Sequence, residues 1–359
     1  MNKTELLRSK VTEFGTDALL VTSAVNQRYV TGFDYSDGYA LVTKGAVYLI
    51  TDFRYIEAAK AQANEGVTVL MPADGERMSA LIRRLLDEND AKNVLVEEYT
   101  LSINDYELLN KNLGTGIKLG TGASVILDAM RMYKTADEIA LMQKAQDITD
   151  AAFAHILDFI KPDMTEIEVA LELEFFMRSH GAEAEAFQTI AVSGSNSSRP
   201  HGVPRKEKLE KGFFTMDFGA KVDGYCSDMT RTVVLGKADA EMKRLYNTVL
   251  EAQLAGLEAV KVGADLAGCD KIARDIIDGA GYKGAFGHSL GHGVGMYIHE
   301  EPRLSFRASG KLEVGNVVTV EPGIYLEGKY GCRIEDMVAV TEDGIHNFTH
   351  SPKELIELF

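Results

Sequence analysis

Four carboxylates and one histidine recur in glycine-flanked or turn-like settings in the second half of this 359-residue chain. They are Asp217, Asp228, His292, Glu321 and Glu335. Oxygen ligands with a single imidazole suit hard or borderline divalent cations, and two such cations would offset the charge of the carboxylates. The residue types therefore predict a site for two divalent metal ions a few ångströms apart.

The first two carboxylates lie on either side of a turn-forming segment. Asp217 ends an apolar run, residues 219–224 have the composition of a turn, and Asp228 lies in the next apolar run. Antiparallel pairing across this turn would bring both carboxylates to one face of a hairpin. Either aspartate alone is better explained as a turn or capping residue. Two buried like charges this close are costly unless a cation lies between them, so the complete set favours metal binding.

The last two carboxylates stand at the ends of apolar runs. Glu321 follows the apolar residues 317–320 and precedes a Pro-Gly turn, whereas Glu335 begins another apolar strand. Strand-end salt bridges would also explain such positions. We nevertheless interpret both as ligands, because surface glutamates are rarely set among apolar residues and glycines.

Residues 287–303 form the segment richest in candidate functional groups, with three histidines and four glycines. They include a literal G-x-S-x-G around Ser289, but the glycines that follow disfavour the helix that a serine nucleophile requires. Downstream, His299 begins His-Glu-Glu-Pro, which lacks the second histidine of the H-E-x-x-H zinc motif. We therefore reject a serine hydrolase and exclude an H-E-x-x-H zinc protease. A further histidine, His201, ends a polar loop and taken alone is best explained as a loop residue.

Composition limits the classes of partner. A net charge of −16 argues against a nucleic-acid surface, because phosphate binding needs clustered Lys and Arg. The N-terminal residues lack a signal-peptide pattern, and no window has the apolar length of a membrane span. The three cysteines are far apart and form no C-x-x-C motif. We therefore expect a cytoplasmic protein with reduced thiols.

The apolar pattern divides the chain near residue 130. Before this point, short apolar runs alternate with helical spacing, which predicts an α/β domain over residues 1–130. After it, capping boxes at Thr135 and Thr165 start two long helices, two more helices follow, and β segments lie between and after them. The predicted helices run from 135 to about 160, 165 to 181, 238 to 260 and 266 to 279. The predicted β segments cover residues 213–218, 225–235, 317–320 and 335–340. Residues 131–359 are therefore expected to form an α+β domain that holds every candidate ligand.

In order along the chain, the motifs of the second domain closely resemble those of the pita-bread metallopeptidases, the family of methionine aminopeptidase, aminopeptidase P and prolidase. The motifs are Pro200-His201-Gly202, Asp217-Phe218-Gly219, Ser227-Asp228-Met229-Thr230-Arg231-Thr232, Gly291-His292-Gly293-Val294-Gly295, His299-Glu300, Glu321-Pro322-Gly323 and Arg333-Ile334-Glu335-Asp336. Residues 1–130 resemble the smaller N-terminal domain of the aminopeptidase P and prolidase branch. The resemblance implies an α+β pita-bread catalytic domain preceded by a smaller α/β creatinase-type domain.

The same resemblance assigns roles to single residues. It implies that Asp217 binds one metal, that Asp228 and Glu335 bridge both, and that His292 and Glu321 complete the second. Glu321 would also move the proton of a metal-bridged hydroxide, and His201 and His299 would contact the substrate and the tetrahedral intermediate. Pocket residues of the proline-specific branch are matched by His288, Tyr325 and Arg333.

The implied function is that of an Xaa-Pro aminopeptidase that acts on small peptides with proline in second position. An Xaa-Pro dipeptidase is the alternative, since Arg303 resembles an arginine with which prolidases bind the substrate carboxylate; a surface arginine explains it equally well. A non-catalytic peptide-binding member of the fold is the alternative from another class, although all five metal ligands are present. The resemblance further implies two divalent ions, Mn(II) first and Co(II), Zn(II) or Fe(II) otherwise. It also implies a homodimer in which one N-terminal domain limits access to the partner's active site.

Overall fold

The computed structural model describes residues 3–35 and 37–359. The chain divides into two compact units, residues 1–130 and 131–359. A single hydrophobic core rarely serves a chain of this length, because large chains split into domains with cores of their own.

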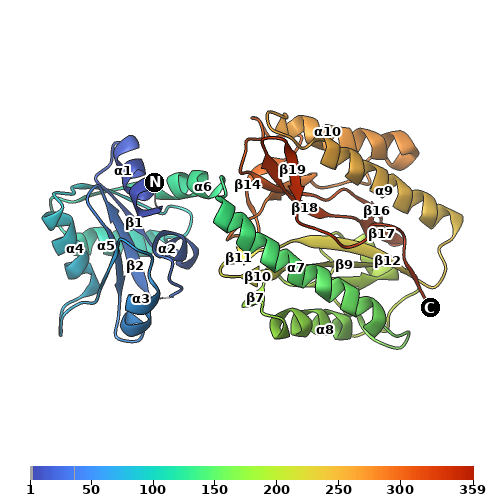
Figure 1. Ribbon diagram of the computed structural model, residues 1–359, viewed down its shortest axis with the longest axis horizontal. Helices are drawn as coiled ribbons and strands as arrows, with labels where there is room; N and C mark the ends of the chain where they lie inside the picture. The colour runs from blue at the N-terminus through green and yellow to red at the C-terminus, as the bar shows by residue number, and fades with distance from the viewer. Residues whose placement is uncertain (1–2, 36) are drawn as a thin grey trace. The chain divides into compact units, whose positions relative to one another are not determined.

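A six-stranded mixed sheet forms the centre of the first unit (Figure 1), in the strand order β4-β3-β2-β1-β5-β6. Its strands are β1 (Ala18–Val21), β2 (Gly38–Thr43), β3 (Val47–Thr51), β4 (Val67–Leu70), β5 (Asn93–Val96) and β6 (Lys118–Thr121). The helices are α1 (Lys3–Glu13), α2 (Ala24–Thr31), α3 (Ile56–Gln62), α4 (Met78–Glu88), α5 (Ile103–Leu113) and α6 (Ala123–Arg131). Parallel pairs β3/β4, β1/β5 and β5/β6 flank the antiparallel strand β2, so the predicted α/β class is confirmed.

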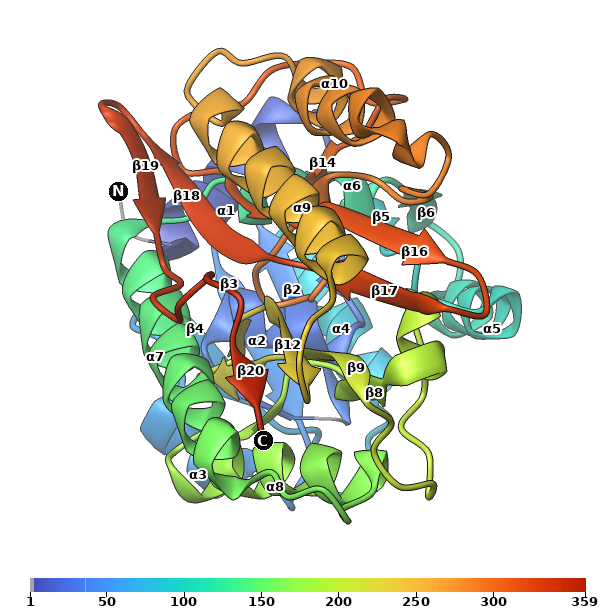
Figure 2. The same ribbon diagram turned by 90° about the vertical axis from the view of Figure 1, so that its right-hand side faces the viewer.

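Two helix pairs enclose the strands of the second unit. They are α7 (Ala136–Phe159) with α8 (Glu166–Ser179), and α9 (Ala240–Ala259) with α10 (Leu266–Ile277). Figures 1 and 2 show α9 and α10 on one side of the strands and α8 on the other. Thr135 and Thr165 each form the capping box expected from the sequence, with Glu138 and Glu168 respectively. These boxes satisfy backbone N–H groups that the first turn of a helix leaves unpaired.

The strands of the second unit belong to four sheets. One is β20-β12-β9-β8, a second is β14-β13-β15-β18-β19, and two small ones are β11-β10-β7 and β16-β17. Their bounds are β7 (Ala184–Glu185), β8 (Ile190–Ser193), β9 (Gly212–Phe218), β10 (Ala220–Val222), β11 (Tyr225–Cys226), β12 (Met229–Leu235), β13 (Gly291–Gly293), β14 (Glu300–Leu304), β15 (Val317–Val320), β16 (Gly323–Leu326), β17 (Tyr330–Arg333), β18 (Asp336–Thr341), β19 (Gly344–Asn347) and β20 (Glu357–Leu358).

Two hydrophobic cores lie between the helix pairs and the two larger sheets. Side chains of α7 and α8 pack on β9 and β12, with Phe153 and Phe214 among the fully buried members. Side chains of α9 and α10 pack on β15 and β18, with Val249 and Val318 among theirs. Phe213 of β9 and Val234 of β12 also belong to this second core, so the two sheets pack together and support a site between them.

One predicted element is wrong in detail. Residues 225–235 were expected as one continuous strand, but they form β11 and β12 with a break at Ser227 and Asp228. The cause is a second small hairpin, in which β10 pairs with β11 across Asp223 and Gly224. Both turn residues have positive φ, 48° and 87°, as a tight type I′ connection requires.

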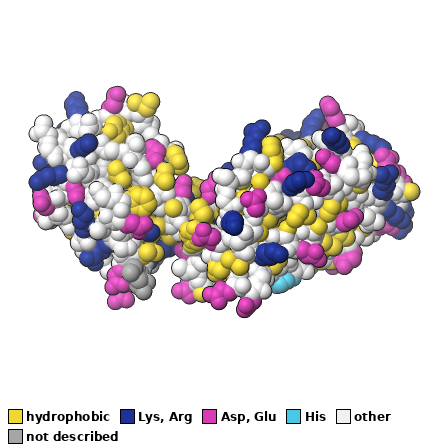
Figure 3. Space-filling model, turned by 90° about the horizontal axis from the view of Figure 1, so that it is seen from above, with side chains coloured by type: hydrophobic (Ala, Val, Ile, Leu, Met, Phe, Trp, Pro, Cys, Tyr) yellow, Lys and Arg dark blue, Asp and Glu magenta, His cyan; other side chains and the backbone are white. Residues whose placement is uncertain are grey.

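Among the residues that the structure describes, no helix has the length and apolar character needed to cross a membrane. On the face drawn in Figure 3, Lys and Arg side chains lie scattered among Asp and Glu. The net charge of −16 is therefore not concentrated on one part of that face.

Candidate metal centre and substrate pocket

The β9–β12 pair positions the two aspartates. Asp217 on β9 lies opposite Thr230 on β12, and Asp228 comes two residues before Thr230. Asp228 lies just outside β12, and both carboxylates line the same cavity. Gly219 permits this close approach, because a Cβ atom there would overlap the carbonyl oxygen of Ser227.

The β15–β18 pair positions the two glutamates. Val320 pairs with Asp336, so Glu321, which follows β15, and Glu335, which precedes β18, emerge at the same end of this sheet. The backbone N–H of Glu335 donates to the carbonyl oxygen of Thr230 at 3.1 Å. This bond joins the two larger sheets at the point where all four carboxylates are gathered.

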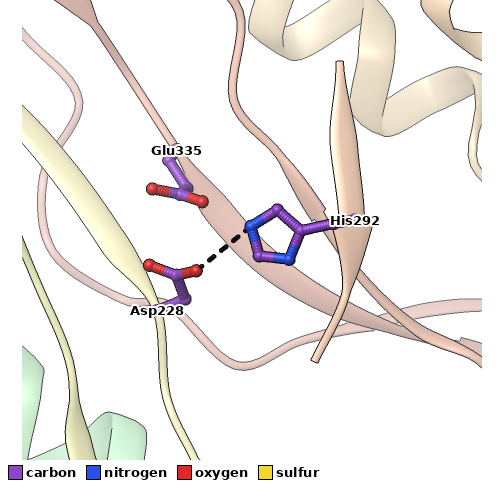
Figure 4. Close-up of side chains that lie close together, drawn as sticks. All are labelled: Asp228, His292 and Glu335. Atoms are coloured by element: carbon purple, nitrogen blue, oxygen red, sulfur yellow. Dashed lines mark ion pairs between the residues drawn. The ribbon is translucent and has the colours of Figure 1, made fainter. Parts of the chain in front are cut away.

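His292 lies in the middle of β13, next to β15, and its ring faces the carboxylates (Figure 4). Its Nε2 atom lies 3.5 Å from Asp228 Oδ2 and 3.4 Å from Glu321 Oε1. The other ring nitrogen, Nδ1, lies 3.1 Å from the carbonyl oxygen of Gly293. A donor bond from Nδ1 to that carbonyl leaves Nε2 free to act as a ligand.

The ligand atoms of Asp228, His292 and Glu335 all lie within 4.8 Å of one another, as Figure 4 shows. Glu321 joins them through its contact with His292. Asp217 differs, because its Oδ2 atom pairs with the Arg333 guanidinium. Its Oδ1 atom is buried and, within the described residues, has no hydrogen-bond partner.

The electrostatics of this cluster call for positive charge. Burial, reinforced by Glu335, raises the pKa of Asp228 well above its usual range, and burial reinforced by Glu321 does the same to Glu335. Burial also raises the pKa of Glu321 to about 8. In contrast, burial lowers the pKa of His292 to about 3, so this imidazole is neutral at pH 7. Acidic oxygens forced together, a buried carboxylate oxygen without a partner and a neutral imidazole fit a pair of divalent cations.

All five candidate ligands line a cavity of about 360 Å³. Five of the other predicted site residues line it as well: His201, His288, His299, Arg303 and Arg333. Tyr325 lies behind the wall and connects two of them, because its hydroxyl group lies 2.9 Å from His288 Nε2 and accepts a bond from Arg333 at 2.7 Å. Ser289 also lines the cavity, but β13 follows it rather than a helix, as expected when the serine mechanism was rejected.

Two threonines that orient carboxylates were not predicted. The Thr230 hydroxyl donates to Glu335 Oε2 at 2.6 Å and accepts from Arg333 Nε at 3.0 Å. The Thr319 hydroxyl donates to Glu321 Oε1 at 3.1 Å. Thr319 comes two residues before Glu321, so the alternation of side chains was a signal that could have identified it. Thr230 bonds to a ligand 105 residues further along the chain, and no local signal indicated that contact.

The family model for metallopeptidase family M24 matches residues 140–342. This chain belongs to metallopeptidase family M24. The family model for the creatinase/prolidase N-terminal domain matches residues 3–133. The resemblance to the aminopeptidase P and prolidase branch, inferred from the motifs, is thereby confirmed.

Several M24 relatives match the chain over nearly its whole length. The structure of an Xaa-Pro dipeptidase from Bacillus anthracis is 42% identical, with a TM-score of 0.94 and 99% of each chain covered. The structure of an X-Pro aminopeptidase from Thermotoga maritima is 35% identical, with a TM-score of 0.91, covering 98% of this chain and 100% of that one. An Xaa-Pro dipeptidase from Pyrococcus horikoshii is 36% identical, with 97% of each chain covered. Relatives of both specificities are thus similar to this M24 chain.

Proposed function

We propose that this metallopeptidase hydrolyses the bond between an N-terminal residue and a following proline, using two divalent cations held by Asp217, Asp228, His292, Glu321 and Glu335. The observation that carries the proposal is the single cavity that brings these five side chains together with His201 and His299. The carboxylate-rich donor set favours Mn(II), with Co(II), Zn(II) and Fe(II) as alternatives. The complete ligand set also argues against a non-catalytic binding protein.

When bound, the two cations would supply a hydroxide nucleophile near neutral pH and positive charge for the scissile carbonyl oxygen. Glu321 is the candidate for the proton transfer. Its Oε1 accepts from Thr319, which fixes the carboxylate, while Oε2 faces the substrate side, 3.9 Å from His288 Nδ1. From this position it can take the proton of the attacking water and pass it to the leaving nitrogen.

His299 and His201 are the candidates for stabilising the oxyanion. The ring centroid of His299 lies 4.4 Å from that of the proposed ligand His292, which supports this role. Burial lowers the pKa of His299, so the ring is neutral and offers one N–H donor. A donor fixed where negative charge develops stabilises the transition state more than the ground state.

His288 and Arg333 line the cavity, and the Tyr325 hydroxyl connects them from behind its wall. Burial, with the charge of Arg333 nearby, lowers the pKa of His288 to about 3, so this imidazole is also neutral. The imino nitrogen of an Xaa-Pro bond has no N–H to donate, so a wall of rings can select the pyrrolidine by shape. We infer that these residues form the proline side of the pocket.

Chelation followed by metal replacement tests the proposal. EDTA should abolish the hydrolysis of Xaa-Pro peptides, and added Mn(II) should restore it. Full activity after chelation, verified by elemental analysis, would contradict a metal mechanism.

A dipeptidase remains the second candidate because of Arg303. This side chain lines the cavity with His299, and its ion pair with Glu301 is long, at 3.7 Å. A dipeptidase must bind the carboxylate next to the proline ring, and a guanidinium can do so with two parallel bonds.

Ala-Pro and Ala-Pro-Ala distinguish the two activities. An aminopeptidase should cleave the tripeptide with the higher kcat/KM, because it uses the residue after proline. A dipeptide preference that is lost in Arg303→Ala would identify a dipeptidase instead.

A further inference from the structure

The loop that carries His201 connects β8 to the segment before β9 and forms part of the cavity wall. It begins with the 3₁₀ turn η1 (Gly194–Ser198), and its later residues Pro200 to Pro204 all line the cavity. Within the described part of the chain, the exposed His201 ring makes no hydrogen bond to another residue. Its position therefore depends on how the loop backbone is held.

A buried carboxylate outside the cavity holds both ends of this loop. Glu166, the first residue of α8, is 0% exposed. Its Oε1 accepts from Ser193 N (2.7 Å), Ser193 Oγ (2.9 Å) and Arg205 Nη2 (2.9 Å). Its Oε2 accepts from Asn196 Nδ2 (2.9 Å), Arg205 N (2.9 Å) and Arg205 Nε (3.0 Å). Ser193 precedes the loop and Arg205 follows it, so one carboxylate binds the entry and the exit.

Two further hydrogen bonds fix the loop backbone close to His201. Asn196, held by Glu166, also donates from Nδ2 to the carbonyl oxygen of Val203 at 3.1 Å. On the cavity side, Arg333 Nη1 donates to the carbonyl oxygen of Pro200 at 3.1 Å. The backbone is therefore fixed one residue before His201 and two residues after it.

The charge of Glu166 is matched within this network. Arg205 forms an ion pair with it, and the N-terminus of α8 contributes the positive end of the helix dipole. Glu166 does not line the cavity, so its carboxylate acts on the site through the groups that donate hydrogen bonds to it.

We propose that Glu166 is a positioning residue for the reaction, whose hydrogen bonds to Ser193, Asn196 and Arg205 hold the His201 imidazole at the substrate. The inference rests on the proposed function, in which His201 contacts the substrate and the tetrahedral intermediate. Displacement of such a group by about 1 Å can lower the rate by about 10²-fold.

Glu166→Gln tests the proposal, because glutamine keeps the shape but replaces one acceptor oxygen with an NH₂ group. We expect kcat on an Xaa-Pro peptide to fall by about 10-fold to 100-fold with little change in KM, while elemental analysis finds the parental metal content. Glu168→Gln is the matched control. Glu168 lies in the same first turn of α8 but, among the described residues, its carboxylate bonds only to Thr165, so kcat of this variant should stay at the parental value.

A double-mutant cycle separates positioning from a general loss of structure. If Glu166 acts through His201, adding Glu166→Gln to His201→Ala should lower kcat by no more than about twofold. Multiplicative effects of the two substitutions, or loss of metal in Glu166→Gln alone, would overturn the inference. Should Glu166→Gln fail to fold, Arg205→Lys keeps the positive charge but not the planar fork, and the same cycle applies to it.

Hydrogen–deuterium exchange tests the loop without any assay of activity. Amides of residues 194–205 should exchange faster in Glu166→Gln than in Glu168→Gln or the parent. Unchanged exchange would overturn the inference even if activity fell. Faster exchange in a protein whose parent cleaves no Xaa-Pro peptide would retain the structural role of Glu166 and contradict only the proposed function.

Discussion

The five candidate ligands differ in what holds them, and this difference predicts how their replacement will act. Asp228 and Glu335 lie together with His292 around one point, whereas His201 and His299, proposed to contact the substrate, lie outside that group. We expect Asp228→Ala and Glu335→Ala each to abolish activity and to reduce metal content, because each is proposed to bridge both cations. The measurements are kcat on an Xaa-Pro peptide and elemental analysis.

The histidines should behave differently. His201→Ala and His299→Ala should keep the metal but lower kcat by about 10²-fold, which is typical for the loss of one oxyanion donor. Loss of metal in either variant would place that histidine among the ligands instead.

The same residues predict a pH dependence for the metal-free protein. Burial raises the pKa of Glu321 from the ordinary 4.5 to about 8. A carboxyl group with the higher pKa in the folded state binds its proton more firmly there than in the unfolded chain. The free energy of unfolding must therefore fall as pH rises from about 4.5 towards about 8, since unfolding then releases the group from an unfavourable charge.

We thus expect the Tm of the chelated protein to fall between about pH 5 and about pH 8, and the Tm of the Mn(II)-loaded protein to fall less. Calorimetry in buffers of different ionisation enthalpy should also detect protons released on metal binding. Equal pH dependence of the two Tm values would show that these carboxyl groups do not hold extra protons.

At the scale of elements, strands and caps were the most predictable features. The apolar run at 317–320 is β15, and the boxes at Thr135 and Thr165 begin α7 and α8. In each case the signal is local: an unbroken apolar run buried on both faces, or a cap three residues from its partner. The break at Asp228 was not predicted. It follows from the pairing of β11 with β10, and the apolar pattern of residues 225–235 does not indicate that pairing.

The environment of the site was less predictable than its residues. Arg333 bonds to Asp217, Pro200 and Thr230, which come from two different segments far away in the sequence. Glu166 could be predicted only as a helix-start residue, because its six donor atoms belong to Ser193, Asn196 and Arg205, which are 27 to 39 residues further along the chain. The motifs identify the residue types of the site. The hydrogen bonds of Arg333 and Glu166 depend on the tertiary packing, which the motifs do not describe.

Close backbone approach in the β9–β12 region predicts the effect of one substitution. Gly219→Ala places a Cβ atom against the carbonyl of Ser227 and must separate the strands that present Asp217 and Asp228. We expect weaker Mn(II) binding, measured by titration of the chelated protein, and a loss of stability of about 1–3 kcal/mol, as for overpacking in a core. Gly279→Ala is the control, because no atom lies within 4 Å of a Cβ atom there. Equal metal affinity in both variants would contradict this role of Gly219.

At the scale of the whole molecule, the first unit carries a surface that is unusual for a monomer. Phe53, Tyr99 and Ile103 are 84%, 69% and 80% exposed. They adjoin Asp52, Arg54, Thr100 and Leu101, which line one hollow beside the sheet. Exposed apolar side chains whose chain neighbours line one hollow are candidates for contact with a protein partner.

We therefore expect a homodimer that uses this surface, in agreement with the resemblance of residues 1–130. Light scattering should give twice the 39.3 kDa mass of the chain over a wide concentration range. Phe53→Arg combined with Ile103→Arg should shift the mass towards that of the monomer, because two charges would have to be desolvated in the interface. Phe14→Arg, at a side chain that is 48% exposed elsewhere in the same unit, should leave the mass unchanged.

If the partner's N-terminal domain limits access to the active site, the monomeric variant should also cleave longer Xaa-Pro peptides faster relative to Ala-Pro-Ala. A monomer mass for the parent chain at every concentration would contradict both expectations.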